Sequence, residues 1–406
     1  MPEDLKVEDG ARVEVDLVDG NLLAGRGSRI KARSGNQIVV KALAKFRGGC
    51  EIQSGLKARS LEGEGTIHIT GDVLIEDSVD VDDGRLIVDG SLEASDIEVG
   101  RELRTGKDLR CRELDVGGGA QVEGNMEVEE GDIGGRISVS GTLKGRSLDV
   151  GGAAEVKGLT ELQELDVGGK ARVGGGAIRS IDVGGVFESS GKLSSESIDV
   201  GGVLRLNSGE QIGRIKVGGK LDIDDGIDFR LIDVGGVASI KGPVKGGKME
   251  VGGKLRIESD ADLDELEVGG KAEIDGALKA REIEVGGTLA ADLCVSTEIE
   301  IGGKAETRKG IKADRFEIGK QGKVRGPLVA RHVEIGDLAE AEDVFADDLE
   351  MGDGARARNI YARSATLGSN CEVSGDLQYV EKLEFGEDLR SQSAPKKVDK
   401  LPQPPI

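Results

Sequence analysis

The chain has 406 residues, a formal net charge of −22 and only 2% aromatic residues, with no tryptophan. This excess of acidic residues argues against nucleic-acid binding along the molecule, because a polyanion repels the phosphate backbone. No stretch approaches 18 consecutive apolar residues, which excludes a membrane-spanning helix. No apolar run follows Met1, so we expect no signal peptide and a cytoplasmic location. Four cysteines far apart in the sequence favour buried thiols over disulfides or a zinc site.

Residues 1–60 are expected to form a basic N-terminal cap or β segment. Between Arg26 and Arg59 there are nine Lys or Arg residues and one acid, Glu51, interleaved with β-like sequence at 37–40. The basic patch consists of Arg26, Arg29, Lys31, Arg33, Lys41, Lys45 and Arg47. It is either a basic face of the cap or a docking patch for an acidic surface. Candidate partners are lipid headgroups at a membrane, an acidic protein or the flank of a neighbouring copy.

From residue 61 to residue 387 the sequence repeats with a short period. The phrase Asp-Val-Gly-Gly recurs, for example at 149–152 and 166–169, and softens to Glu-Val-Gly-Gly at 250–253. We call the apolar residue of each phrase a marker. Nineteen markers, from Val81 to Phe385, follow one another at spacings of 16, 17 or 18 residues. A fixed period of this length predicts a solenoid, in which one small unit is stacked many times.

Each repeat contains three apolar pairs, and the two members of each pair stand two residues apart. After Val251 the pairs are Leu255/Ile257, Ala261/Leu263 and Leu266/Val268. Such alternation is typical of strands with one face inward. Three short strands in 17 residues predict one coil of a single-stranded, three-sided, parallel β-helix with about 19 or more coils. At ~4.8 Å per coil, the markers span ~90 Å.

The corners between these strands carry the glycines. Gly-Gly follows each marker in the middle of the chain, as at Gly252-Gly253. We expect these glycines to supply the positive φ angles that other residues resist.

An acidic residue precedes 17 of the 19 markers, which predicts a ladder of carboxylates along one edge. Like charges ~4.8 Å apart are unfavourable, and Lys three residues after a marker, as at Lys254 and Lys271, is a candidate to offset them. The ladder is then a solvated, partly paired edge. Alternatively it binds cations, or it prevents copies from joining sideways. The candidate cation edge is Asp149, Asp166, Asp182 and Asp199.

The regular Gly-Gly is lost after Gly303. We expect Leu383 and Phe385 to lie on or near the terminal coil, where they either contact a second copy or seal the core. Residues 388–406 are polar and Pro-rich, which predicts a flexible tail that is a spacer or a short docking motif.

Sequence motifs for catalysis or cofactors are weak. No Gly-Gly phrase is followed by Lys-Ser or Lys-Thr at the spacing of a phosphate-binding loop. The two histidines, His68 and His332, have no Ser or Cys partner set by the pattern. We therefore expect no catalytic residue, no cofactor and no metal site apart from the candidate cation edge.

The coil at 84–99, Gly-Arg-Leu-Ile-Val-Asp-Gly-Ser-Leu-Glu-Ala-Ser-Asp-Ile-Glu-Val, resembles the coils of the bactofilins, which are polymer-forming cytoskeletal proteins. The resemblance covers residues 81 to 385. It implies a right-handed β-helix that stacks end to end into nonpolar filaments without nucleotide.

These observations favour a non-enzymatic structural protein, a rod or scaffold that assembles through its ends. Open strand edges at the ends of a β-helix are templates for pairing. The alternative is a monomeric spacer or binding module whose acidic edge or tail holds cations or a basic partner. An enzyme with a site on one flat side is a third possibility.

Overall fold

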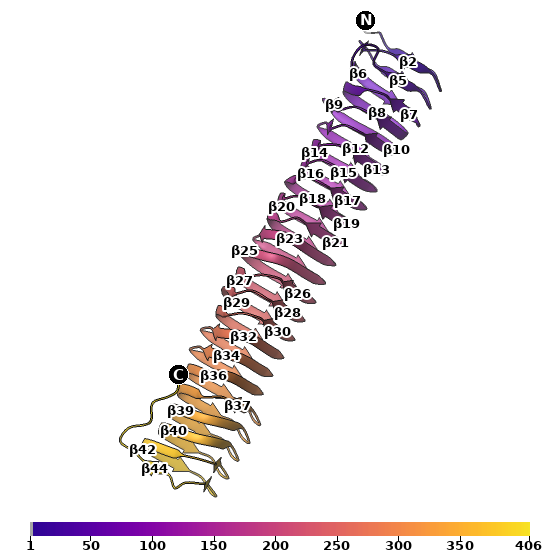
Figure 1. The fold of residues 1–406 in the computed structure, drawn as a ribbon. Helices are drawn as coiled ribbons and strands as arrows, with labels where there is room; N and C mark the ends of the chain where they lie inside the picture. The colour runs from indigo at the N-terminus through magenta and orange to yellow at the C-terminus, as the bar shows by residue number, and fades with distance from the viewer. Residues whose placement is uncertain (1–2) are drawn as a thin grey trace. The chain divides into compact units, whose positions relative to one another are not determined.

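The structure, a computed structural model, describes residues 3–406 and is built from parallel β-strands arranged as a β-helix (Figure 1). The predicted fold class is thereby confirmed. The chain divides into two compact units, unit 1 up to Leu206 and unit 2 from Asn207 onward, and the division falls inside one strand, Val203–Val217. Residues 3–406 contain no helix, and so none that could cross a membrane.

The strands are short and closely spaced throughout. Strands β1 to β24 are Leu5–Val7, Arg12–Glu14, Leu17–Val18, Leu22–Ala24, Arg29–Lys31, Gln37–Phe46, Cys50–Ile52, Gly55–Ile69, Val73–Ile75, Ser78–Val88, Leu92–Glu93, Asp96–Val99, Glu102–Thr105, Leu109–Val116, Gly119–Val122, Met126–Ile133, Arg136–Val139, Leu143–Val150, Ala153–Val156, Thr160–Val167, Lys170–Val173, Gly176–Val183, Val186–Ser194 and Ser197–Val200. Strands β25 to β44 are Val203–Val217, Lys220–Ile223, Ile227–Val234, Val237–Ile240, Val244–Val251, Lys254–Ile257, Ala261–Val268, Lys271–Lys279, Glu282–Val285, Thr288–Val295, Glu298–Ile301, Lys304–Ile318, Lys323–Arg325, Leu328–Ile335, Glu340–Met351, Arg356–Leu367, Glu372–Val373, Leu377–Phe385, Arg390–Ser391 and Lys396–Lys397.

One coil has three sides, as the apolar pattern predicts. In the coil around β20, side 2 is the first half of the strand (160–162), side 3 is its second half (164–167), and side 1 is the following strand β21. Two consecutive exposed residues, Gln163 and Glu164, mark the bend within β20. The three predicted strands are therefore one strand of four residues and one of eight that turns a corner.

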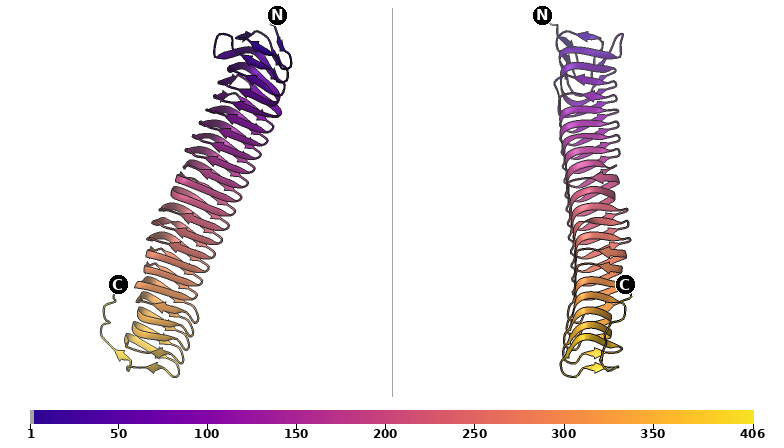
Figure 2. Two further views of the ribbon diagram at one scale, coloured as in Figure 1. Left: turned by 45° about the vertical axis from the view of Figure 1, so that its right-hand side comes forward. Right: turned by 90° about the vertical axis from the view of Figure 1, so that its left-hand side faces the viewer.

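Within each unit, every side pairs in parallel with the same side of the next coil, usually 17 residues on (Figure 2). This register stacks like residues in columns: Val150, Val167 and Val183 form one inward column in unit 1, and all three are fully buried. The four cysteines are free and buried, as predicted.

The role expected for the Gly-Gly corners is wrong. Their φ angles are not positive. Instead, each corner lies almost against the corner of the preceding coil: a Cβ on Gly168 would lie 2.5 Å from the carbonyl oxygen of Gly151, and one on Gly169 would lie 2.4 Å from that of Gly152. Glycine is required there because a side chain has no space.

Most corners that use left-handed φ angles lie toward the two ends of the chain. The residues are Gly10, Gly27, Gly49, Gly65 and Asp83 in unit 1, and Gly310, Gln321, Gly326, Leu338, Gly354, Asn370 and Asp388 in unit 2. In the middle of the chain, Gly175, Gly176 and Gln211 also have positive φ angles. The change of corner therefore follows the loss of Gly-Gly after Gly303 that is visible in the sequence.

The first and last coils extend the ladder beyond the clear repeats. Strands β1, β2 and β3, within residues 1–60, pair in parallel with β4, β5 and β6. At the other end, β43 and β44, in the segment 388–406, pair with β41 and β42. Residues 398–406 contain no strand and turn back along the outside of unit 2 until Ile406 lies beside Gly310 (Figure 2).

Candidate functional site

Side 3 of unit 1 carries a column of carboxylates in register. We call it the acidic column, and it comprises Asp80, Glu98, Asp115, Asp132, Asp149, Asp166, Asp182 and Asp199. Asp149, Asp166, Asp182 and Asp199, the candidate cation edge, thus lie side by side on four successive coils. At the spacing of adjacent strands, ~4.8 Å, their repulsion is considerable.

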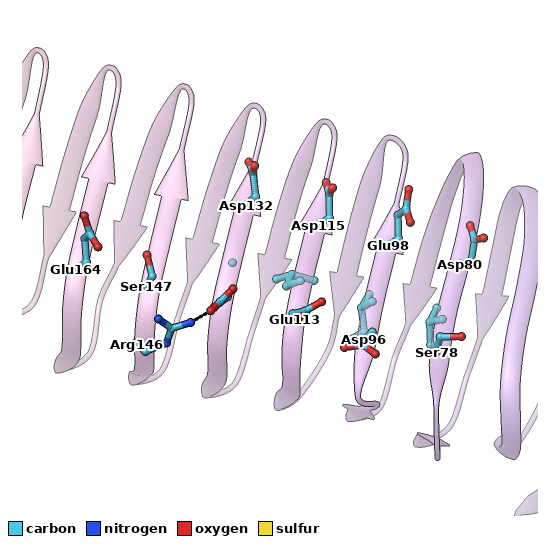
Figure 3. Close-up of a pocket in the computed structure, with 15 residues that line it drawn as sticks. Ser78, Asp80, Asp96, Glu98, Glu113, Asp115, Asp132, Arg146, Ser147 and Glu164 are labelled. Carbon is cyan, nitrogen blue, oxygen red and sulfur yellow. Dashed lines mark ion pairs between the residues drawn. The ribbon is translucent and has the colours of Figure 1, made fainter.

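A second set of acids lies two residues earlier in each coil, which the sequence interpretation missed. Asp96, Glu113 and Glu130 are in register on side 3 next to the acidic column. Together the two sets line a shallow depression of about 720 Å³. Figure 3 shows Asp80, Glu98, Asp115 and Asp132 in a row along it.

The two sets differ in their cationic partners. Arg112 lies 2.6 Å from Asp96 and also contacts Glu113. Arg146 contacts Glu130, and Figure 3 marks this ion pair with a dashed line. Within residues 3–206, by contrast, no Lys or Arg forms an ion pair with Glu98, Asp115, Asp132, Asp149, Asp166 or Asp182. Only the corner residues are therefore compensated.

The missing compensation changes the acidity of the column. Partial burial, together with the charges of Asp149, Asp182 and Glu164, raises the pKa of Asp166 above its usual value. Partial burial and the neighbouring Asp82 and Glu62 do the same to the pKa of Asp80. Asp166 and Asp80 are thus less stable in their charged forms than they would be in water.

In unit 2 the corresponding column is mostly Glu and is interrupted by cations. Lys248 lies 2.6 Å from Glu250, 2.7 Å from Glu265 and 3.4 Å from Glu267. Farther along, burial and the charges of Glu317, Glu284 and Glu298 raise the pKa of Glu300.

The lysines three residues after the markers do not compensate the column, contrary to expectation. Lys254 binds Glu273 at 2.8 Å and Lys304 binds Glu306 at 2.5 Å, and both acids lie on side 1. The other four behave alike: Lys170, Lys220, Lys271 and Lys320 pair with Glu188, Asp222, Glu273 and Asp337. The reason is geometric, because these lysines begin or lead into side 1, which the corner turns away from side 3.

Side 1 holds ion clusters that the sequence interpretation also missed. Glu188 lies 2.7 Å from Arg172, 2.8 Å from Arg205 and 3.1 Å from Lys170, and Arg172 above all lowers the pKa of Glu188 to about 2. In unit 2, Lys254 and Lys271 lower the pKa of Glu273 to about 2. The sequence signal is opposite charges 16 to 19 residues apart, joined in unit 2 by Lys271 two residues before Glu273.

The basic patch lies among acids that are distant in sequence but adjacent in the ladder. Its ion pairs are Arg29 with Glu51 at 3.0 Å, Lys31 with Glu14 at 2.9 Å, Lys41 with Asp19 at 2.6 Å and Lys45 with Glu62 at 2.6 Å. Arg33 donates to the carbonyl oxygen of Glu14. Arg26 and Arg47 lie at the corners near Gly27 and Gly48. Much of the positive charge is therefore matched locally.

Leu383 and Phe385 lie on side 3 of the last complete coil. Their segment pairs with Ser364–Leu367 on one edge only, and Phe385 is 54% exposed. At the start of unit 1, Leu17 on β3 is also exposed, at 51%. Each end of the chain thus combines a strand edge with an exposed apolar side chain.

Nucleophilic and metal-binding groups do not converge in the described part of the chain. Burial raises the pKa of Cys111 and of Cys294 to about 12, so neither thiol ionises near neutral pH. His68 lies 3.0 Å from Asp89 and His332 lies 3.4 Å from Asp348, both at the surface. Among residues 3–406, no group of three or more His, Cys, Asp or Glu side chains is placed to hold a metal ion.

No protein-family model matches the chain, and neither a curated protein nor a solved structure is significantly similar to it.

Proposed function

We propose that this protein is a non-enzymatic structural protein, a cytoplasmic scaffold of the bactofilin type that assembles through its ends without nucleotide. The observation that carries the proposal is the state of the strand edges. Within the part of the chain that the structure describes, strands β1, β2 and β3 pair only with the following coil. The last segment of side 3 pairs only with the preceding coil. An unpaired edge is a template for another strand.

The chemistry of the side chains supports a structural role over an enzymatic one. The outward charges of side 1 neutralise one another in regular ion clusters. The thiols of Cys111 and Cys294 are held protonated by burial. Four free cysteines are in keeping with a reducing compartment.

The proposal is tested by sedimentation and negative-stain microscopy of the purified chain at two salt concentrations. Assembly into filaments is the expected result, and sedimentation as a monomer under all conditions would refute it. The variant Phe385→Arg sharpens the test, because a cation at this exposed position opposes a contact between copies. Loss of polymer with an unchanged melting curve supports an end contact. A lower melting temperature with intact assembly would make Phe385 a cap of the core.

A second candidate function is that of a monomeric spacer that holds cations or a basic partner. The raised pKa of Asp166 favours it, because a bound cation would relieve the repulsion within the acidic column. We expect Ca²⁺ or Mg²⁺ to raise the melting temperature of the wild type. Changing Asp149, Asp166, Asp182 and Asp199 together to Asn should abolish that rise. A wild type that does not respond to either ion rules out the cation role.

A further inference from the structure

The C-terminal segment, residues 388–406, covers two of the three sides of the last complete coil. Strand β43 pairs with β41 on side 1, and β44 pairs with β42 on side 2. The backbone N–H of Arg390 donates to the carbonyl oxygen of Cys371 at 2.9 Å, and that of Val398 donates to Tyr379 at 2.8 Å. The strand edges of sides 1 and 2 are therefore occupied by the chain itself.

The edge that this segment presents is a poorer template than the edge that it covers. Strand β44 is two residues long, follows Pro395 and consists of lysines. Its Lys397 continues the inward column of Ala362 and Tyr379, so a cation stands where a further coil would need an apolar residue. Short strands, proline, lysine and inward-pointing charges all keep an edge from pairing with another chain. The segment therefore closes this end of the ladder on sides 1 and 2.

The end of the C-terminal segment is held far from these two strands. Residues 398–406 run back along the outside of unit 2 past about four coils, until the Ile406 side chain lies beside Gly310 (Figure 2). A Cβ on Gly310 would lie 2.6 Å from Cδ1 of Ile406, so glycine leaves the space that Ile406 occupies. Leu293 and Pro327, both half-buried, precede and follow Gly310 on the neighbouring coils. We call Leu293, Gly310 and Pro327 the notch.

Burial along the segment identifies its anchoring side chains. Leu401 and Ile406 are half-buried, whereas the four residues between them are exposed. Three of those four are prolines, which restrict the backbone and so reduce the entropy that is lost on docking. The segment is also tethered, and a short tether gives an effective concentration on the order of millimolar. A small apolar contact therefore suffices to hold it.

We propose that the notch is the docking site of the C-terminal segment, and that docking keeps the C-terminal edge capped, so that assembly depends on release of the segment. The effect on assembly rests on the proposed function, whereas the docking does not. In nonpolar filaments like ends meet. Both copies must then release the segment before their last coils can meet on all three sides.

The variant Ile406→Asp tests the docking without removing a strand, because a carboxylate loses its hydration in an apolar notch. Gln403→Asp is the matched control, since it adds the same charge at an exposed position of the same segment. Limited digestion with trypsin reports the docking, because Lys396, Lys397 and Lys400 lie in the segment. We expect cleavage there to be on the order of tenfold faster in Ile406→Asp than in the wild type or the control. An equal rate in all three chains would overturn the docking.

Sedimentation of the same chains tests the cap. The critical concentration for assembly should fall by up to about tenfold in Ile406→Asp, as the fraction of released ends rises, and should keep its wild-type value in Gln403→Asp. Val398→Pro is a second variant, because it removes the N–H that binds the Tyr379 carbonyl and loosens β44 without touching the notch. It should lower the critical concentration as well. An unchanged melting temperature shows that the coils themselves are intact.

The two measurements separate the cap from assembly itself. Faster cleavage of Ile406→Asp with one critical concentration for all four chains would overturn the cap but leave assembly through the ends intact. If none of the chains polymerises, including those with a released segment, assembly through the ends is refuted and the cap with it.

Discussion

Sides 1 and 3 of unit 1 are both built from parallel strands with the same coil spacing, but their charged side chains are arranged differently. On side 1, Glu155, Arg172, Glu188 and Arg205 alternate in sign along the ladder, and the lysine that begins β21 adds a further cation. On side 3 the acidic column repeats one sign over eight coils. The fold therefore does not dictate the column, because alternation is available on the adjacent side.

The difference is visible in the acidity of the two sides. The pKa of Glu188 falls to about 2, whereas the pKa of Asp166 rises. Side 1 contributes electrostatic stability and side 3 reduces it. The acidic column lowers the stability of the chain, and residues that do so are often functional.

Charge reversal on side 1 should have the largest effect. Glu188→Lys sets a fourth cation among Lys170, Arg172 and Arg205, and we expect the free energy of unfolding to fall by about 3 kcal/mol. Urea denaturation measures the loss. Asp149→Lys, the same reversal on side 3, is the control and should leave stability unchanged or raise it. Equal losses in the two variants would contradict the comparison.

Acid should affect the two sides with opposite signs. The pKa values of Glu188 and Glu273 are lowered from 4.5 to about 2, so the stability they contribute is present above pH 4.5 and is lost as the pH falls toward 2. Before solvent screening this amounts to at most about 3 kcal/mol for each group. The raised pKa values of Asp80, Asp166 and Glu300 act in reverse, because protonation relieves their repulsion as the pH falls through the folded pKa.

Thermal melting from pH 7 to pH 2 should therefore show a slight rise in melting temperature on mild acidification and a steep fall below about pH 4.5. The variant Glu188→Gln should show a shallower fall. A monotonic curve with no difference between the variant and the wild type would contradict both assignments.

Lys248, one of the cations on side 3 of unit 2, provides an intermediate case. Lys248→Gln removes the charge shared by Glu250, Glu265 and Glu267 and recreates an uncompensated column. We expect a loss of about 1 kcal/mol, which grows at low ionic strength. Lys245→Gln, on the adjacent side 2, is the control and should have no comparable effect.

Neutralising one member of the acidic column should have the smallest effect, and it should be a gain. Asp166→Asn removes the repulsion with Asp149 and Asp182, and we expect stability to rise by less than about 1 kcal/mol because the side chain is exposed. The gain should shrink as NaCl is added. A loss of stability at low salt would show that the column is compensated.

The sequence sufficed to predict the coil, because its period identifies the inward residues one by one. Val150, Val167 and Val183 occupy one column, and Leu255 and Ile257 are fully buried, as their spacing predicts. It also sufficed for the acidic column, which follows directly from the register.

The sequence does not predict which side chains pair across a corner, nor how closely two corners approach each other. The period gives the distance between coils but not the direction in which a corner turns, so the pairing expected for Lys254 falls on side 3, whereas Lys254 pairs with Glu273 on side 1. The sequence likewise does not give the distance between neighbouring backbones. It therefore predicts a positive φ angle at Gly168, whereas glycine is needed there because the Gly151 carbonyl oxygen leaves no space for a Cβ. The basic patch looked unbalanced because its partners, such as Glu14 and Glu62, lie one coil away.

The close approach of the Gly-Gly corners has a consequence for how such a gene changes length. A point mutation in a corner meets the carbonyl of the coil beneath, so single substitutions there are disfavoured. Removal of residues 151–167, by contrast, joins Val150 to Gly168 and restores every column of unit 1 in register. Recombination that removes or adds one whole coil therefore preserves the register of the columns, whereas a substitution in a Gly-Gly corner disrupts the packing of that corner. The number of coils is accordingly easier to vary than the sequence of any one corner.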